Sequence, residues 1–166
     1  VSARTAGFST YSLGTFSNAG LLVLTVRMFI GASPGSTGGG IKTSTFFVII
    51  QGIKSAATNQ SERAFHYAIP MGTFRKAVVI TLLSLAVVVL GTFFMLIMEP
   101  DITLSAALFE ITSAFGTVGL STGITPDLCD GSKLLSILIM YIGRLGPLTI
   151  ASLWYFNKGE RARYPD

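Results

Sequence analysis

The stretch TLSAALFEITSAFGTVGLST, residues 103–122, decides how this sequence folds. Its first part, Thr103 to Phe115, is an apolar run of 13 residues, whereas a helix needs about 20 residues to cross the hydrocarbon core of a membrane. A segment rich in Gly and Thr follows at once, from Thr117 to Thr122. This pattern is typical of a re-entrant helix that dips into the membrane and stops, followed by an extended loop.

Longer apolar segments lie on both sides of this stretch. Residues 77–98 (AVVITLLSLAVVVLGTFFMLIM) form a run of 22 residues without a charge, which predicts a spanning helix. Residues 134–156 form a run of 23 residues with one charge, Arg144, followed by Gly146 and Pro147. This second run predicts another spanning helix, with an interruption at the Gly-Pro pair.

The composition of the 166 residues also indicates a membrane protein. Half of them are hydrophobic, 12% are charged and the mean hydropathy is +0.64, whereas soluble domains carry about a quarter charged residues. A disordered chain is excluded, and a soluble enzyme is disfavoured. The single cysteine, Cys129, excludes an internal disulfide, and no Cys/His cluster has the spacing of a zinc site.

Charged residues are distributed unevenly between the connecting segments. Residues 54–76 hold four cations and one acid, residues 157–166 hold three cations and two acids, and residues 99–131 hold five acids and neither Lys nor Arg. By the positive-inside rule the first two segments are cytoplasmic and the third is external. We therefore expect a multi-pass protein of the cytoplasmic membrane with a cytoplasmic C-terminus. The net charge of +4 then reflects topology, and no nucleic-acid partner is expected.

Two segments of the sequence repeat at a constant offset. TAGFST (residues 5–10) matches TVGLST (residues 117–122), with 117 − 5 = 112, and MFIG (residues 28–31) matches MYIG (residues 140–143), with 140 − 28 = 112. Each copy is expected to be the same element, a T-x-G-[FL]-S-T segment, a polar turn and a membrane helix. A single such segment is more often a turn, but two copies in register before membrane helices favour an ion filter.

A helix, a half-helix, a Gly/Thr loop and a second helix make up an ion-channel pore unit. A dehydrated monovalent cation needs oxygens in place of its water shell, and the backbone carbonyls of a short extended loop supply them. Gly7 and Gly119 allow the dihedrals that aim successive carbonyls inward, and Thr5 and Thr117 can add a hydroxyl at the inner end. Glu110, in the short helix, is expected either to brace this loop through backbone hydrogen bonds or to lie at the outer surface.

A glycine-rich break separates two further apolar stretches. Residues 19–33 and 43–53 flank the segment PGSTGGGIK, residues 34–42, so the pattern predicts a helix, an unwound middle and a helix. Non-helical backbone at membrane depth is tolerated only where protein encloses it or where it lines a water-filled cavity, so the break is expected to face a pathway. A phosphate-binding loop is the alternative, but the lysine that the Walker pattern needs after Gly40 is replaced by Ile41.

Four segments carry a resemblance to a known family: RTAGFST (4–10), FIGASPGSTGGGIKTST (29–45), SAFGTVGLSTGITPDL (113–128) and YIGRLGPLT (141–149). They resemble the Trk/Ktr/HKT superfamily of potassium transporters, most closely its KtrB/NtpJ type. The resemblance implies an all-α membrane protein built of potassium-channel-like helix–pore-loop–helix repeats, four per polypeptide around one pore. This chain, which opens at Val1, is expected to be a C-terminal fragment with the end of the third repeat and the complete fourth.

The expected division of the chain follows from this resemblance. The parts are 1–53, the end of the third repeat with its filter strand and the gating loop 34–42; 54–76, a cytoplasmic connection; 77–156, the fourth repeat (helix 77–98, pore helix 103–115, filter 117–122, helix 134–156); and 157–166, a cytoplasmic tail.

The resemblance also implies roles for individual residues. Each repeat supplies one filter strand, and glycine at Gly7 and Gly119 goes with potassium preference. The expected filter residues are Thr5, Ala6, Gly7, Phe8, Thr117, Val118, Gly119 and Leu120. The expected gate residues are Gly35, Ser36, Thr37, Gly38, Gly39, Gly40, Lys42 and Arg144. Arg144 is expected to project into the pore as a barrier to cations; the alternative is a structural arginine bonded to carbonyls of the broken helix.

The expected function is potassium uptake across the cytoplasmic membrane, with no covalent chemistry and therefore not as an enzyme. The resemblance implies potassium as the transported ion, sodium as a coupled (symport) or activating ion, a homodimer, and a cytosolic RCK-type nucleotide-binding regulator of the KtrA/TrkA kind. Two other classes stay open. A membrane subunit associated with a sodium-translocating ATPase lacks support from any Walker motif, and a structural membrane scaffold does not account for the paired filter motifs.

Overall fold

The structure, a computed structural model, describes residues 7, 9, 13–35, 38–58, 63–64, 67–68 and 71–146. The elements, with η for a 3-10 helix, follow in the order η2 (Leu13–Thr15), α1 (Asn18–Phe29), α2 (Thr43–Thr58), β1 (Arg63–Ala64), β2 (Tyr67–Ala68), α3 (Met71–Met98), α4 (Leu104–Phe115), η3 (Thr125–Asp127) and α5 (Asp130–Leu145). The predominantly helical fold is confirmed. The two strands are a small addition, a two-residue antiparallel pair between α2 and α3.

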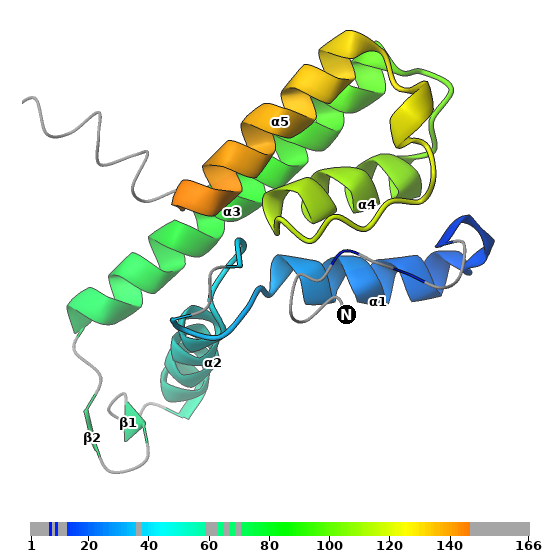
Figure 1. The fold of residues 1–166 in the computed structure, drawn as a ribbon. Helices are drawn as coiled ribbons and strands as arrows, with labels where there is room; N and C mark the ends of the chain where they lie inside the picture. The colour runs from blue at the N-terminus through cyan, green and yellow to red at the C-terminus, as the bar shows by residue number, and fades with distance from the viewer. Residues whose placement is uncertain are drawn as a thin grey trace, which may run out of the picture.

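The short helix α4 lies at the centre of the fold, with α1 on one side and α3 and α5 on the other (Figure 1). Ala107, Ile111 and Phe115, spaced four residues apart, pack against α3 and α5, whereas Phe109 packs against α1. A helix that is apolar on more than one face is stable only when other elements cover those faces. The burial of α4 therefore fits a half-helix enclosed by other helices.

Among the described helices, α3 is the one that is long and apolar enough to cross a membrane: its 27 residues Gly72–Met98 contain an 18-residue stretch with a mean hydropathy of 2.6. The hydroxyls of Thr81, Ser84 and Thr92 each donate to the carbonyl four residues earlier, at 2.8–2.9 Å, so they need no water. Its exposed apolar side chains include Leu82, Val89, Phe93 and Ile97. Such a surface suits contact with lipid.

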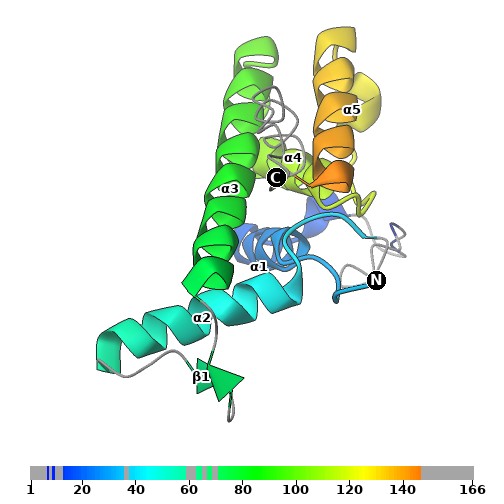
Figure 2. The ribbon, with the colours of Figure 1, turned by 90° about the vertical axis from the view of Figure 1, so that its left-hand side faces the viewer.

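The helices α3 and α5 run antiparallel and side by side, and α4 lies across them (Figures 1 and 2). The helix α2 crosses the beginning of α3, where Gly52 lies against the ring of Phe74. A glycine at that crossing allows the two helices to approach closely.

Two helices are longer than predicted, because each predicted boundary was placed where the apolar run begins or ends. The helix predicted at 77–98 begins at Met71, and the helix predicted at 43–53 continues to Thr58. The extra residues include Lys54, Arg75 and Lys76, which are good helix formers although they are not apolar. The predicted connection, residues 54–76, is therefore helical at both of its ends.

The predicted end of the first helix, at Ser33, is wrong by four residues. The helix α1 ends at Phe29, because Gly31 donates its backbone N–H to the carbonyl of Ile41 (2.8 Å) and Ile41 donates to the carbonyl of Phe29 (3.1 Å). These two bonds form an isolated parallel bridge between Ile30 and Ile41. A pairing with Ile41, near the end of the glycine-rich break, replaces the next helical turn.

The helix predicted at 134–156 also differs from α5. The helix begins four residues earlier, at Asp130, because its first turn is polar and an apolar run does not include it. The residue before this turn, Cys129, donates its backbone N–H to the carboxylate of Glu99. The helix ends at Leu145, where Gly146 takes a left-handed φ of +84° ahead of Pro147. The remainder of the predicted helix, 147–156, lies outside the described residues.

The internal repeat is visible in the positions of the elements. The helices η2 and η3 begin at Leu13 and Thr125, and α1 and α5 begin at Asn18 and Asp130, so both pairs have the offset 125 − 13 = 130 − 18 = 112. The two copies therefore share a 3-10 turn and a helix start at the same register. They differ at the far end, where α1 breaks and α5 continues.

Candidate functional site

The two segments predicted to be filter strands approach each other at Gly7 and Gly119. Gly7 and Gly119 both have left-handed dihedrals, with φ of +67° and +80°, which glycine adopts without steric cost. A Cβ on Gly7 would lie 2.6 Å from the carbonyl oxygen of Val118 and 3.5 Å from the Cα of Gly119, so the two backbones are in contact. The other predicted residues of the first strand, Thr5, Ala6 and Phe8, lie outside the described residues.

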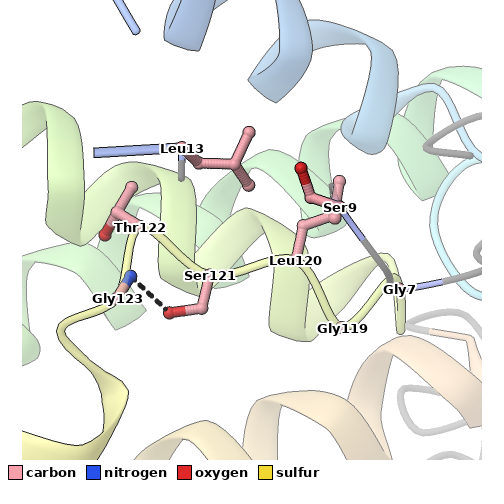
Figure 3. A pocket seen from close by; sticks show the side chains of 8 residues that line it. All are labelled: Gly7, Ser9, Leu13, Gly119, Leu120, Ser121, Thr122 and Gly123. Carbon is pink, nitrogen blue, oxygen red and sulfur yellow. Dashed lines mark hydrogen bonds between the residues drawn. The ribbon is translucent and has the colours of Figure 1, made fainter. Parts of the chain in front are cut away.

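A pocket of about 250 Å³ lies where the two strands meet (Figure 3). This is room for several water molecules, since one occupies about 30 Å³ in the liquid. The lining comes from both copies of the repeat and is formed by Gly7, Ser9, Leu13, Gly119, Leu120, Ser121, Thr122 and Gly123. Six of the eight lining residues are therefore glycines or carry a hydroxyl group.

The second predicted filter strand starts as the cap of helix α4. Thr117 donates its backbone N–H to the carbonyl of Ala114 (3.0 Å), and Val118 donates to the carbonyl of Ser113 (2.9 Å). This is the Schellman pattern of helix ends, in which the turning residue is left-handed and usually glycine. Here it is Thr117, with φ of +52°, which costs about 1–2 kcal/mol relative to a right-handed residue. Such strain persists only where the surrounding structure holds the residue in place.

The hydroxyl of Thr117 has a partner from the other copy of the repeat. The backbone N–H of Gly39, in the glycine-rich break, donates to the Thr117 Oγ1 at 3.0 Å. A Cβ on Gly39 would lie 2.9 Å from the carbonyl oxygen of Phe115, so the break packs directly on the end of α4. The structure therefore brings the predicted gate segment into contact with the inner end of the predicted filter strand.

The glycine-rich break is a closed loop. Its ends are joined by the bridge between Ile30 and Ile41, and the Nζ of Lys42 donates to the carbonyl of Gly38 at 3.0 Å. Gly35 and Gly40 have left-handed φ values of +88° and +79°. The remaining predicted gate residues of this loop, Ser36 and Thr37, lie outside the described residues.

Glu110 lies in the buried part of α4, with 8% of its surface exposed. Its Oε1 accepts hydrogen bonds from the hydroxyl of Ser121 (2.6 Å) and from the backbone N–H and hydroxyl of Thr122 (2.8 and 3.1 Å). Its Oε2 accepts from the hydroxyl of Thr125 at 3.3 Å. Of the two positions that the sequence allowed, the structure therefore shows the brace.

Arg144 lies in the last turn of α5, with its side chain exposed. The residue before it, Gly143, packs against the backbone of Phe115, so closely that a Cβ on Gly143 would overlap the Phe115 carbonyl oxygen. This contact places the turn that carries Arg144 beside the end of α4, where the predicted filter strand begins.

Sequence reasoning missed the close approaches that hold these parts together. Gly143 against Phe115 and Gly31 against Gly39 are backbone contacts between segments far apart in the chain or across the break. The available signal was a glycine inside an otherwise apolar helix, which usually has a packing reason. The left-handed Thr117 gave no signal, because threonine is uncommon at that position of a helix cap.

Glu99 follows directly after α3 and holds the start of α5. The backbone N–H of Cys129 donates to its Oε1. This bond, assisted by the nearby Lys133, lowers the pKa of Glu99 below its ordinary value.

The lowered pKa predicts an acid-sensitive stability. Because the folded-state pKa lies below the unfolded-state value, the stabilisation is present above the unfolded-state pKa and is lost as pH falls through the folded-state pKa. We expect the unfolding temperature of the detergent-solubilised protein to fall in this acidic range, and Glu99→Gln to weaken that dependence. Asp101→Asn, at an exposed carboxylate nearby, is the control; an unchanged pH profile in Glu99→Gln would contradict the assignment.

Comparison with known proteins adds independent findings. The model of the family described as "TrkH: Cation transport protein" matches residues 1–157. The chain is 38% identical over 167 residues to the Ktr system potassium uptake protein B of Bacillus subtilis (strain 168), covering 100% of this chain and 37% of that protein. It is 37% identical over 177 residues to the potassium/sodium uptake protein NtpJ of Enterococcus hirae, covering 100% of this chain and 38% of that protein.

A solved structure shares the fold. The crystal structure of the potassium transporter TrkH from Vibrio parahaemolyticus superposes with a TM-score of 0.76 at 22% identity, covering 92% of this chain and 34% of that one. The chain spans little more than a third of the length of the curated relatives it matches. It belongs to the TrkH family of cation transport proteins, which are membrane transporters and not enzymes.

Proposed function

We propose that this chain supplies two of the filter strands of a potassium uptake transporter of the cytoplasmic membrane. The observation that carries the proposal is the meeting of Gly7 and Gly119, two left-handed glycines 112 residues apart, beside a pocket lined by backbone and hydroxyl groups. The backbone carbonyl oxygens of short extended strands can replace the water shell of a monovalent cation. The names of the relatives, potassium uptake and potassium/sodium uptake proteins, support potassium as the transported ion and sodium as a second ion.

The division into repeats is part of the proposal. The end of a third repeat (1–53) and a complete fourth (77–156) would contribute two strands, and the other two strands of a four-repeat pore would come from the part of the relatives' length that this chain does not cover. The common offset of η2 and η3 and of α1 and α5 supports this division. Conduction is therefore to be tested in the full-length transporter that carries this sequence.

The test of the proposed function is ion flux in lipid vesicles that contain the purified full-length transporter. We expect rubidium, a potassium substitute, to enter down its gradient without added ATP. The rival reading, a subunit associated with a sodium-translocating ATPase, predicts uptake only with ATP hydrolysis, and a membrane scaffold predicts none. Either of these outcomes would exclude the proposed function.

The gate is proposed to consist of the glycine-rich loop and Arg144. The contact between Gly39 and Thr117 supports a loop that lies against the inner end of the filter, and the position of Arg144 beside the end of α4 supports a fixed positive charge near the same place. A cation that passes such a charge meets an electrostatic barrier.

Removal of this charge should therefore raise transport. We expect Arg144→Ala to increase the maximal rubidium uptake rate roughly two- to tenfold, and Arg144→Lys to leave it near the wild-type value, because lysine keeps the positive charge. The measurement is initial uptake in a potassium-uptake-deficient bacterium, normalised to the amount of transporter in the membrane. Unchanged uptake in Arg144→Ala would contradict the barrier role.

The proposed topology is multi-pass, with the basic connection 54–76 and the tail 157–166 in the cytoplasm. We propose further that the transporter is a homodimer and that a cytosolic RCK-type nucleotide-binding subunit contacts these basic segments. Site-specific cysteine labelling tests the topology: in a transporter from which the exposed Cys129 and any other cysteine have been removed, a cysteine introduced at Lys54 should be labelled only after the membrane is permeabilised. Affinity purification from the native membrane tests the two partners.

A further inference from the structure

We infer that Glu110 is a positioning residue for ion selectivity, because it fastens the outer end of the second filter strand to the pore helix. The inference rests on the proposed function, since it concerns the same filter. It assigns a role to a side chain that neither forms the filter nor belongs to the gate.

The first argument is the direction of the hydrogen bonds. The hydrogen-bond partners of Glu110 among the described residues all come from the segment after Gly119, so these bonds join α4 to a separate segment of the chain. The inner end of the strand is already held by the helix cap at Thr117 and Val118. Glu110 supplies a second attachment, at the outer end, so that the strand is fixed on both sides of Gly119.

The second argument is that the hydroxyl donors and the acceptors around Glu110 match one another. The hydroxyl of Ser121 has one proton, which it donates to Glu110, and its oxygen accepts the backbone N–H of Gly123 at 2.9 Å (Figure 3). The single proton of the Thr125 hydroxyl has two candidate acceptors, the oxygen of Ser121 at 2.7 Å and the Oε2 of Glu110 at 3.3 Å. Residues 121–125 thus form one connected network centred on the carboxylate.

The third argument is the contrast with the first strand. At the repeat offset of 112, the position that corresponds to Thr125 is Leu13, which is buried with Leu21 and Leu120. Apolar packing therefore anchors the 3-10 turn after the first strand, whereas hydrogen bonds to Glu110 anchor the turn after the second. A change at Glu110 should loosen one strand and leave the other in place.

The consequence for transport follows from how a filter discriminates. Selection of potassium over the smaller sodium depends on the number and the placement of the coordinating carbonyls. Buried hydrogen bonds to a charged group fix geometry more firmly than neutral ones. Loss of the outer attachment should allow the strand to relax, and selectivity should fall more than the uptake rate does.

The test compares two substitutions at Glu110 in the full-length transporter. Glu110→Ala removes every acceptor, whereas the amide oxygen of Glu110→Gln can accept the three bonds of Oε1 and its amide nitrogen can donate to the Thr125 oxygen. The measurement is the sodium concentration that halves rubidium uptake, together with the maximal rate. We expect about a tenfold loss of discrimination in Glu110→Ala and a loss of no more than about threefold in Glu110→Gln.

The controls separate a brace from a simple external charge. If Glu110 acted by attracting cations, Glu110→Gln would lose as much as Glu110→Ala, and this result would overturn the inference. Unchanged discrimination in Glu110→Ala would overturn it as well. Asp101→Ala, which removes an exposed external carboxylate, should leave discrimination unchanged.

A variant that keeps the buried carboxylate covers the case in which Glu110→Ala does not reach the membrane. The double substitution Ser121→Ala with Thr125→Val removes two hydroxyl donors on the strand side, and we expect it to lower discrimination in the same direction. Wild-type discrimination in this variant would overturn the inference. If the wild-type transporter took up no rubidium, the proposed function itself would be wrong, which is a different outcome from a failure of the inference about Glu110.

Discussion

Replacement of Gly7 by alanine should abolish potassium-selective uptake. The residue has a φ of +67°, where a side chain costs about 1–2 kcal/mol, and its Cβ would lie 2.6 Å from the backbone carbonyl oxygen of Val118. A backbone atom cannot rotate away as a side chain can, so one of the two filter strands must move. We expect rubidium uptake by Gly7→Ala, at equal amounts of transporter in the membrane, to fall at least about a hundredfold.

Two other left-handed glycines serve as matched controls for this prediction. A Cβ on Gly119, with φ of +80°, would lie 3.5 Å from the Cα of Gly7, which is ordinary contact, and a Cβ on Gly123, with φ of +103°, would have no atom within 4 Å. Alanine at these positions pays the dihedral cost without the overlap, so uptake should fall less. Equal losses in all three variants, or wild-type uptake in Gly7→Ala, would contradict the contact between the strands.

Replacement of Gly143 by alanine should have the largest effect on stability. The Cβ would overlap the carbonyl oxygen of Phe115, so α5 would have to move away from the end of α4. Overpacking at a rigid backbone contact costs about 1–3 kcal/mol or more. We expect a clearly lower unfolding temperature in detergent, with loss of transporter from the membrane at growth temperature.

A second glycine-to-alanine substitution tests whether the effect is local. Gly72, in the first turn of α3, is exposed and has no atom within 4 Å of its Cβ position. Alanine there should be neutral or should stabilise α3 by up to about 1 kcal/mol, because alanine has the higher helix propensity. If Gly143→Ala unfolded at the same temperature as Gly72→Ala, this result would contradict the close packing of α5 on α4.

The sequence allowed the arrangement of the filter to be predicted in outline. The repeated T-x-G-x-S-T motif led to the expectation that Gly7 and Gly119 share one site, and the structure brings their backbones into contact. The half-helix before the second motif was expected at 103–115 and is found as Leu104–Phe115, with the hydroxyl of Thr103 as its N-cap. Short length between longer apolar runs was the signal that made this possible.

Helix ends were predicted less well, since hydropathy reports contact with lipid and not backbone hydrogen bonding. The end of α1 depends on a bridge between Ile30, which precedes the glycine-rich break, and Ile41, which lies near the end of the break. The beginning of α5 depends on Glu99, some thirty residues earlier, which accepts the backbone N–H of Cys129. Both are tertiary contacts, which no periodicity within the helix encodes.

The internal contacts of the site were beyond sequence reasoning for the same reason. The bond between Gly39 and Thr117 joins residues 78 positions apart, and no pattern pairs them. The sequence left two positions open for Glu110, because an acidic residue in a short apolar helix is compatible with either. Only the positions of Ser121 and Thr122 decided between them.

The most direct test of the central claim is rubidium uptake by the full-length transporter in a potassium-uptake-deficient bacterium, with sodium as competitor, for the wild type and for Gly119→Ser. We expect wild-type uptake to be potassium-selective, and Gly119→Ser to keep measurable uptake but to lose selectivity, because a side chain then enters the site where the two strands meet. Absence of uptake, or selectivity that is indifferent to Gly119, would show that the paired motifs are not a filter.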